Sequence, residues 1–151
     1  MRKFLLVMLA SSSLFTYAQK LHLKSGEFVP SANVGQIENF SQWQTTQYLQ
    51  KSYCIVQFDR STSIEERNAL SKVTGIQFFD YLPRWAFIAS IPVQYDVNQL
   101  AQYHVRSVLP FEATYKVHPK LAERPFPVWM QKGNKVELYI QPMNLVAQAE
   151  A

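Results

Sequence analysis

The residues of this chain that could do chemistry are few and stand far apart. The three histidines, His22, His104 and His118, fall in different parts of the sequence, and none belongs to a metal-binding spacing such as His-Glu-x-x-His. Cys54 is the single cysteine, so neither a cysteine pair for a metal nor an intrachain disulfide is available. A free cysteine inside an apolar run is typical of a buried small side chain. We therefore expect no metal ion and no cofactor.

Catalytic motifs of other kinds are also missing from the sequence. There is no Gly-x-Ser-x-Gly elbow and no glycine-rich phosphate loop in a chain with four glycines. Glu65 and Glu66 could act as paired carboxylates, but Ser63 precedes them in a capping-box pattern. Carboxylates in a first helical turn are explained by capping and by the helix dipole. We expect this chain not to be an enzyme and to act through what it binds.

Residues 1–18 have the three-part pattern of a signal peptide. Arg2 and Lys3 give a positive start, an apolar run follows, and the small residue Ala18 suits signal peptidase, so cleavage is expected between Ala18 and Gln19. The apolar run is short for a bilayer span, which favours a cleaved signal over an anchor. We expect a secreted protein, extracellular or periplasmic, with no membrane attachment after the signal is removed.

The charge of the mature chain argues against nucleic acid as a partner. The whole chain has a formal net charge of +4, and loss of Arg2 and Lys3 leaves thirteen basic against eleven acidic residues. That balance is too mild for a nucleic-acid surface. The aromatic residues make up 14% of the chain, but the lysines and arginines do not gather around them. Core packing is the better account of the aromatic content.

The middle of the chain repeats a rhythm of strand, capped helix and strand. The pattern predicts strands at 53–58, 76–82, 85–91 and 105–109, with a helix over 64–74 and a second, short helix from Asp96 to about His104. This order predicts an α+β domain over residues 53–118 with one antiparallel sheet and two helices on one face.

The flanking segments have a different character. Residues 19–52 predict a short N-terminal strand at Leu21–Leu23 and a polar linker, and residues 119–134 predict a proline-rich linker. Residues 135–151 predict a strand followed by a helix from Asn144, which is the start of a second α/β unit. Because two such elements bury little apolar surface, we expect the chain to be the front of a longer polypeptide. A docked terminal helix is the alternative.

Both faces of the predicted sheet are apolar. Pairing Tyr81 with Ala86 places Phe79, Tyr81 and Ile88 on the face opposite the two helices. An uncovered face of this kind is a candidate docking surface for a partner. The alternative is that the linker or the tail of the same chain covers it.

The span from Tyr53 to Pro119 resembles the N-terminal prodomain of secreted subtilisin-like serine proteases, of the fervidolysin-like type. The most specific matching block is Asp80-Tyr81-Leu82-Pro83 followed by Ala86-Phe87, and weaker matches lie at residues 54–58, 63–67 and 108–116. The resemblance implies a ferredoxin-like β-α-β-β-α-β fold whose open sheet face packs on the protease. The Asp, His and Ser motifs of the protease itself are absent, so no catalytic residue is carried over.

The resemblance also implies a role and a partner. The chain would be a non-catalytic intramolecular chaperone and inhibitor of a subtilisin-like protease domain, acting in cis or in trans. The segment after the last strand would run extended toward the protease cleft, with Pro110, Phe111, Tyr115 and Lys116 as its contacts. A free-standing protease inhibitor or protein-binding module is the alternative.

Overall fold

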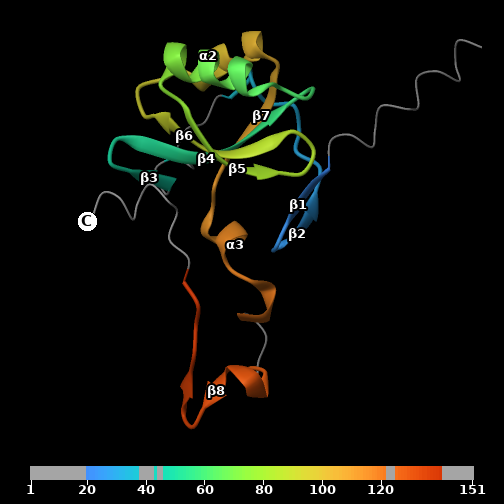
Figure 1. Ribbon diagram of the computed structural model, residues 1–151, viewed down its shortest axis with the longest axis vertical. Helices are drawn as coiled ribbons and strands as arrows, with labels where there is room; N and C mark the ends of the chain where they lie inside the picture. The colour runs from blue at the N-terminus through green and yellow to red at the C-terminus, as the bar shows by residue number, and fades with distance from the viewer. Residues whose placement is uncertain (1–19, 38–42, 44–45, 122–124, 141–151) are drawn as a thin grey trace, which may run out of the picture. The chain divides into compact units, whose positions relative to one another are not determined.

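The computed structural model describes residues 20–37, 43, 46–121 and 125–140, and they fall into two compact units, Met1–Val117 and His118–Ala151 (Figure 1). The predicted signal peptide with its Ala18–Gln19 cleavage site lies outside the described residues, as does the helix predicted from Asn144. Each unit is described by itself below.

The first unit is built on one antiparallel sheet. Its long strands are β4 (Lys51–Phe58), β5 (Gln77–Leu82), β6 (Ala86–Pro92) and β7 (Val105–Pro110). Their spatial order is β7-β4-β6-β5, and each neighbouring pair is antiparallel. A short strand, β3 (Gln47–Tyr48), pairs with the beginning of β4. The predicted α+β class with an antiparallel sheet is confirmed.

Two helices lie on one face of this sheet (Figure 1). Helix α2 (Ile64–Thr74) has the predicted bounds because its capping box forms: Ser63 Oγ accepts from the Glu66 N–H at 3.1 Å, and Glu66 accepts from the Ser63 N–H at 2.7 Å. It ends at Gly75, which takes the left-handed conformation with φ 74°.

The second helix is a 3₁₀ helix, η3 (Val97–Tyr103), where the sequence predicted only a short helix. Asp96 caps it by accepting from the Asn98 N–H at 3.0 Å. Val97 and Leu100 point into the core, whereas Ala101, which the sequence placed in the same apolar stripe, is exposed. The tighter winding explains the difference, since three residues per turn shift the buried side relative to an α-helix.

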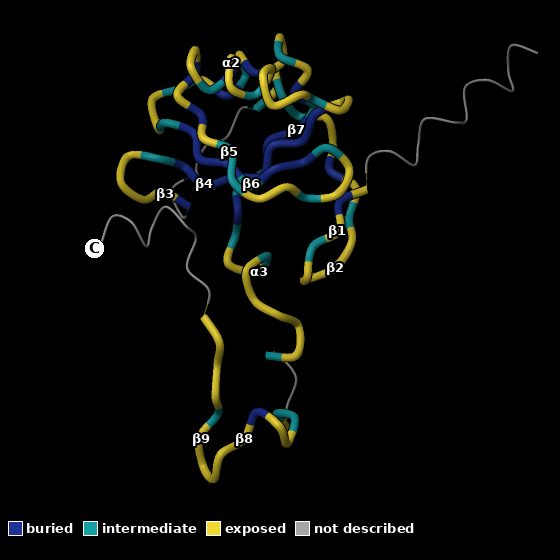
Figure 2. The backbone as a smooth tube through the Cα atoms, viewed as in Figure 1, coloured by how far each residue is buried: buried dark blue, intermediate teal, exposed yellow. Residues whose placement is uncertain are grey.

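The core between the sheet and the helices is made of alternate residues of the central strands. Cys54 and Val56 of β4 face Ala89 and Phe87 of β6, and Leu70 and Leu100 cover them from the two helices. Figure 2 shows β4, β6 and β7 as the most continuously buried backbone of the unit.

The predicted N-terminal strand at Leu21–Leu23 is present as β1, and it belongs to a hairpin that packs on the other side of the sheet. Strands β1 (Leu21–Leu23) and β2 (Gly26–Phe28) form a hairpin on the side away from α2, and Leu21 is fully buried (Figure 1). A short helix, α3 (Ala113–Lys116), lies on that side too. The sequence missed this cover because Leu21 and Phe28 are isolated apolar residues whose partners are distant in the chain.

Two asparagine side chains hold the segment that follows the hairpin. Asn33 donates to the Val108 carbonyl at 2.8 Å and accepts from the Val108 N–H at 2.9 Å, so it pairs with the outer edge of β7 as a further strand would. Asn98 of η3 makes the same reciprocal pair with Ile37, at 3.0 and 3.3 Å. Polar residues 31–37, predicted as linker, are therefore part of the fold.

The second unit contains two 3₁₀ turns, η4 (Pro119–Leu121) and η5 (Val128–Met130), and a hairpin of β8 (Gln131–Lys132) and β9 (Lys135–Val136). The predicted proline-rich linker thus holds short regular elements. The predicted strand over 135–141 is paired only in its first residues, and one more bond joins the Glu137 N–H to the Met130 carbonyl at 2.9 Å. The backbone beyond Glu137 has no strand opposite it among the described residues.

Candidate binding surfaces

The sheet face proposed from the sequence as a docking surface is largely covered. Phe79 and Ile88 do lie on the face away from the helices, but both are only partly exposed. Phe79 stacks on Tyr53 with ring centroids 6.2 Å apart. Ile55, which pairs with Ile88, is fully buried. Of the two alternatives for this face, open or covered, the structure has the covered one.

Tyr81 lies on the opposite side from the one predicted. A bulge in β5 between Phe78 and Tyr81 shifts the register, so Tyr81 pairs with Phe87 and Leu82 pairs with Ala86. A one-residue shift moves a side chain to the other face of a sheet. The Tyr81 ring meets the Phe87 ring edge-on at 5.3 Å, beside helix α2. The sequence could not reveal the bulge, because both registers place apolar residues on both faces.

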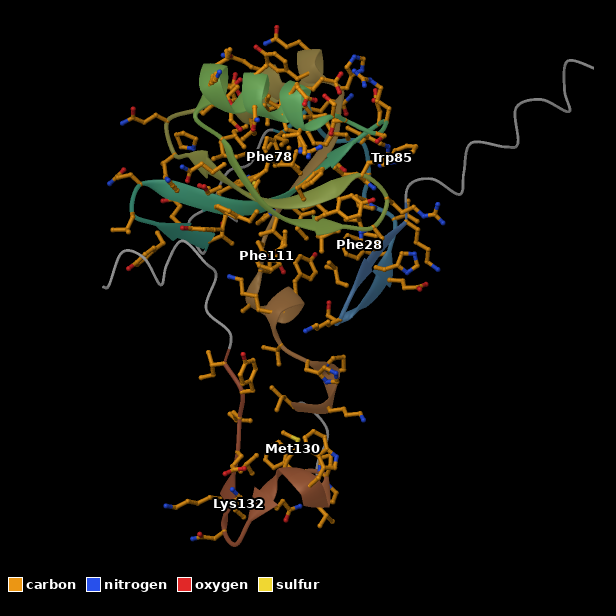
Figure 3. All side chains as sticks on the ribbon, viewed as in Figure 1. Phe28, Phe78, Trp85, Phe111, Met130 and Lys132 are labelled. Carbon is orange, nitrogen blue, oxygen red and sulfur yellow. The ribbon has the colours of Figure 1, made fainter. Side chains whose placement is uncertain are left out.

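The tail after β7 folds back onto its own unit rather than running extended. Pro110 ends β7, and the buried Phe111 donates its N–H to the Tyr53 carbonyl at 3.0 Å. Tyr115 stacks on Phe28 of the hairpin at 5.6 Å, and Lys116 lies 5.0 Å from the centre of the Phe111 ring. Figure 3 shows Phe28 and Phe111 on the same side of the sheet. Phe111 is thus buried and Tyr115 half-buried against the chain's own unit, whereas Lys116 is exposed.

An aromatic pocket of about 310 Å³ lies between α2 and the turn that joins β5 to β6. Its walls combine aromatic rings with one cation and two hydroxyl side chains: Tyr81, Trp85, Phe87, Arg67, Ser61 and Thr62. The Arg67 guanidinium lies 4.5 Å from the centre of the Phe87 ring. Sequence reasoning missed this site because its residues come from three elements. The one local signal was the unusual Pro-Arg-Trp turn.

A larger pocket, of about 540 Å³, lies at the other end of β6 and is lined by Trp43, Tyr95 and Asp96 among others. Asp96 is its one charged lining residue within the described part of the chain. That carboxylate already accepts the first free N–H of η3.

The second unit exposes several large apolar side chains. Trp129 is 74% exposed and Tyr139 is 90% exposed, and the others of this set are Val128, Leu138 and Ile140. Met130 is the one buried residue in the described part of this unit. We call Val128, Trp129, Leu138, Tyr139 and Ile140 the exposed apolar set. Their sequence signal was the alternation of Val136, Leu138 and Ile140, which predicts a strand with one apolar face.

The ionisable residues form ordinary surface pairs. Arg60 pairs with Glu66 at 2.7 Å, and His104 lies 3.4 Å from Asp59, with all four side chains about half exposed. Burial raises the pKa of the Cys54 thiol far above its usual range, so this thiol is not a nucleophile. The described residues hold no cluster of histidine, cysteine or acidic side chains suited to a metal ion. None of the helices in that same part of the chain is long and apolar enough to span a membrane.

A family model described as a domain of unknown function, DUF8729, matches residues 22–112. The match covers more than half of the chain, so the chain belongs to this family. The matched region runs from β1 to the residues just after β7, which treats the hairpin and the sheet as one domain. No curated protein and no solved structure matches the chain.

Proposed function

We propose that this chain is a non-catalytic prodomain of an exported subtilisin-like serine protease, acting as folding assistant and inhibitor, with a ferredoxin-like domain as its first unit. The element order β4-α2-β5-β6-η3-β7, with two helices on one face, supports that fold. The Asp-Tyr-Leu-Pro block at residues 80–83, at the end of β5, supports the relation to such prodomains.

The observation that carries the binding role is the exposed apolar set of the second unit. Five large apolar side chains within residues 128–140 remain more than half exposed. Large apolar side chains left in water in such number within one short stretch of sequence are candidates for contact with another protein. Trp129 and Tyr139 belong to the residue types that dominate the energetics of such contacts.

The partner contact is therefore assigned to the second unit and not to the surfaces inferred from the sequence. Phe79 and Ile88 are only partly exposed, with Phe79 stacked on Tyr53, and Phe111 and Tyr115 pack on the chain itself. Leu138 and Ile140 lie on backbone that is unpaired within the described residues, and such backbone can add to the edge of a sheet in the protease.

Linkage explains how such a module assists folding. A module that binds the folded protease and not its unfolded chain stabilises the folded form by its own binding free energy. If both belong to one polypeptide, the effective concentration reaches the order of millimolar, so moderate affinity suffices.

A refolding experiment tests the proposal. The mature chain, residues 19–151, is added to the denatured subtilisin-like protease domain encoded with it, and recovered activity is measured after dilution of excess prodomain. We expect a several-fold higher yield and inhibition of the native enzyme. The double variant Trp129→Ser/Tyr139→Ser should lose both effects, while Tyr48→Ser, at an exposed tyrosine of the first unit, should keep them. Unchanged yield and activity with the wild-type chain would remove the proposal.

A further inference from the structure

We propose that the pocket between α2 and the β5–β6 turn binds a carboxylate carried beside an aromatic side chain, as at the C-terminal residue of a peptide. This inference is independent of the proposed prodomain role. It rests on the geometry of Arg67, Tyr81, Trp85 and Phe87.

Arg67 brings a positive charge to the pocket without a matching negative one. Its Nη1 donates to the Thr62 carbonyl at 2.6 Å and lies 3.4 Å from the Thr62 hydroxyl oxygen. Its Nε and Nη2 groups have no hydrogen-bond partner among the described residues, and no carboxylate of that part of the chain lies within ion-pair distance. Glu65 senses the Arg67 charge only at longer range. The guanidinium therefore has donors left for a bidentate carboxylate.

The guanidinium is also held in place before any ligand binds. The bond to the Thr62 carbonyl fixes one end of the group, and the Phe87 ring, whose centre lies 4.5 Å from the guanidinium carbon, restricts it further. A side chain that is already ordered loses little freedom when it binds. Arg67 thus behaves as a fixed recognition group and not as a mobile surface charge.

The aromatic wall of the pocket is positioned by a strained turn. Arg84 and Trp85 both have positive φ angles, 69° and 59°, a backbone region that residues other than glycine seldom adopt. Strand β4 holds this turn: the Phe58 N–H donates to the Trp85 carbonyl at 2.9 Å, and the Gln57 amide donates to the Arg84 carbonyl at 3.3 Å. Strain of this kind is found at ligand sites. Figure 3 shows Trp85 at the end of the sheet where this turn lies.

The size of the pocket limits the ligand. A volume of about 310 Å³ is at the lower end for small-molecule sites, which suits one side chain and its carboxylate rather than a cofactor. Tyr81, 58% exposed, and Trp85 can contact an aromatic ring by stacking or edge-on packing. A ring against these two residues would bring an attached carboxylate to Arg67.

Three acetylated peptide probes test the site on the isotope-labelled mature chain by NMR, following the Trp85 indole and Arg67 Nε signals. Acetyl-Gly-Gly-Phe with a free carboxylate should bind about tenfold or more tightly than its C-terminal amide, since the amide lacks the charge that Arg67 pairs. Acetyl-Asp-Phe-amide places the carboxylate on a side chain. Its rank against the free acid shows which source of carboxylate the site prefers.

Variants separate this site from general charge attraction. Arg67→Gln should abolish the preference for the free acid over the amide. Tyr81→Ala should weaken the binding of both the free acid and the amide. Arg60→Gln is the matched control, because it removes the same charge from a guanidinium that already pairs with Glu66 outside the pocket. Circular dichroism checks that each variant is folded. If Arg67→Gln is not folded, Arg67→Lys, which keeps the charge, takes its place. Equal affinity for all three probes, or equal loss of the preference in Arg60→Gln, would overturn the proposal.

Discussion

Cys54 and Ile55 are neighbours in β4 that point to opposite faces of the sheet, and both are fully buried. Every residue of β4 from Ser52 to Phe58 is buried, which is the pattern of a strand covered on both faces. The apolar run Tyr53 to Phe58 contained this information. The expectation of an open docking face rested instead on Phe79, Tyr81 and Ile88, with cover by the chain's own segments as the alternative.

A substitution at Ile55 tests whether the second face is covered. Ile55→Ala should lower the free energy of unfolding by about 2–5 kcal/mol, as for a core isoleucine. The Ile55 side chain is fully buried, so its truncation removes buried apolar atoms and leaves a cavity. Chemical denaturation measures the effect, and Val56→Ala on the helix side is the comparison. A cost below about 1 kcal/mol at Ile55 would mean that this face is open to water.

Side-chain contacts between distant segments were the least predictable part at this scale. The Tyr81 face depends on a bulge, and the Arg67 site depends on three elements meeting. Neither depends on the local periodicity that sequence reasoning uses. Phe78, in contrast, follows from alternation alone: the pattern that puts Phe79 on the face away from the helices puts Phe78 on the helix side, where its ring packs against those of Phe58 and Phe87.

At the scale of elements, local signals predicted the helices and the long strands well. Helix α2 has the predicted bounds because both of its ends are specified locally, by Ser63 and Glu66 at the start and Gly75 at the end. The strands β5, β6 and β7 lie within a residue of their predicted bounds. Strand β1 has the predicted bounds, Leu21–Leu23, whereas its partner β2 and the segment held by Asn33 were not predicted, because their stability comes from long-range contacts.

The capping box of α2 predicts a pH dependence of stability. The Arg60 side chain and the Ser63 backbone N–H both donate to Glu66 and hold the pKa of its carboxyl below the ordinary value of 4.5. A carboxyl whose pKa is lower in the folded state stabilises the fold above the unfolded pKa, and that stabilisation is lost as the pH falls through the folded pKa. Glu66→Gln should therefore be less stable than wild type at pH 7.

The difference between Glu66→Gln and wild type should shrink as the pH falls below about 4.5, where the wild-type carboxyl takes up its proton. Thermal unfolding of both proteins across this pH range measures it. Asp80→Asn, which removes an exposed carboxylate of β5 outside the capping box, is the control for the loss of one acidic charge. A difference that stayed constant with pH would show that the Glu66 charge has no part in capping.

The two hydrogen bonds of Asn33 predict that the N-terminal segment stabilises the β7 edge of the sheet. Asn33→Ala removes both bonds to the backbone of Val108 and should lower stability by about 1–3 kcal/mol, because a partly buried donor and acceptor lose their partners. Hydrogen exchange of the Val108 amide should also become faster. Asn68→Ala, at an exposed position of α2, is the matched control. Unchanged exchange at Val108 would mean that water or another group replaces Asn33.

At the scale of the whole molecule, two units differ in how they are stabilised. The first unit has a core between its sheet and helices and buries Ile55 and Phe111 on the other face, and it contains the whole of the region that matches the family. The second unit buries little apolar surface and leaves Trp129 and Tyr139 in water. A sequence with these two parts suits a stable module that carries a segment for contact with a partner.

Direct measurement of affinity tests the prodomain account most sharply. Titration calorimetry of the mature chain into the folded subtilisin-like protease domain encoded with it should give one-to-one binding with a micromolar or tighter Kd. The Trp129→Ser/Tyr139→Ser variant should bind more weakly by about 2 kcal/mol or more, as expected for the loss of aromatic anchors. Absence of any binding, or full affinity in that variant, would contradict the account.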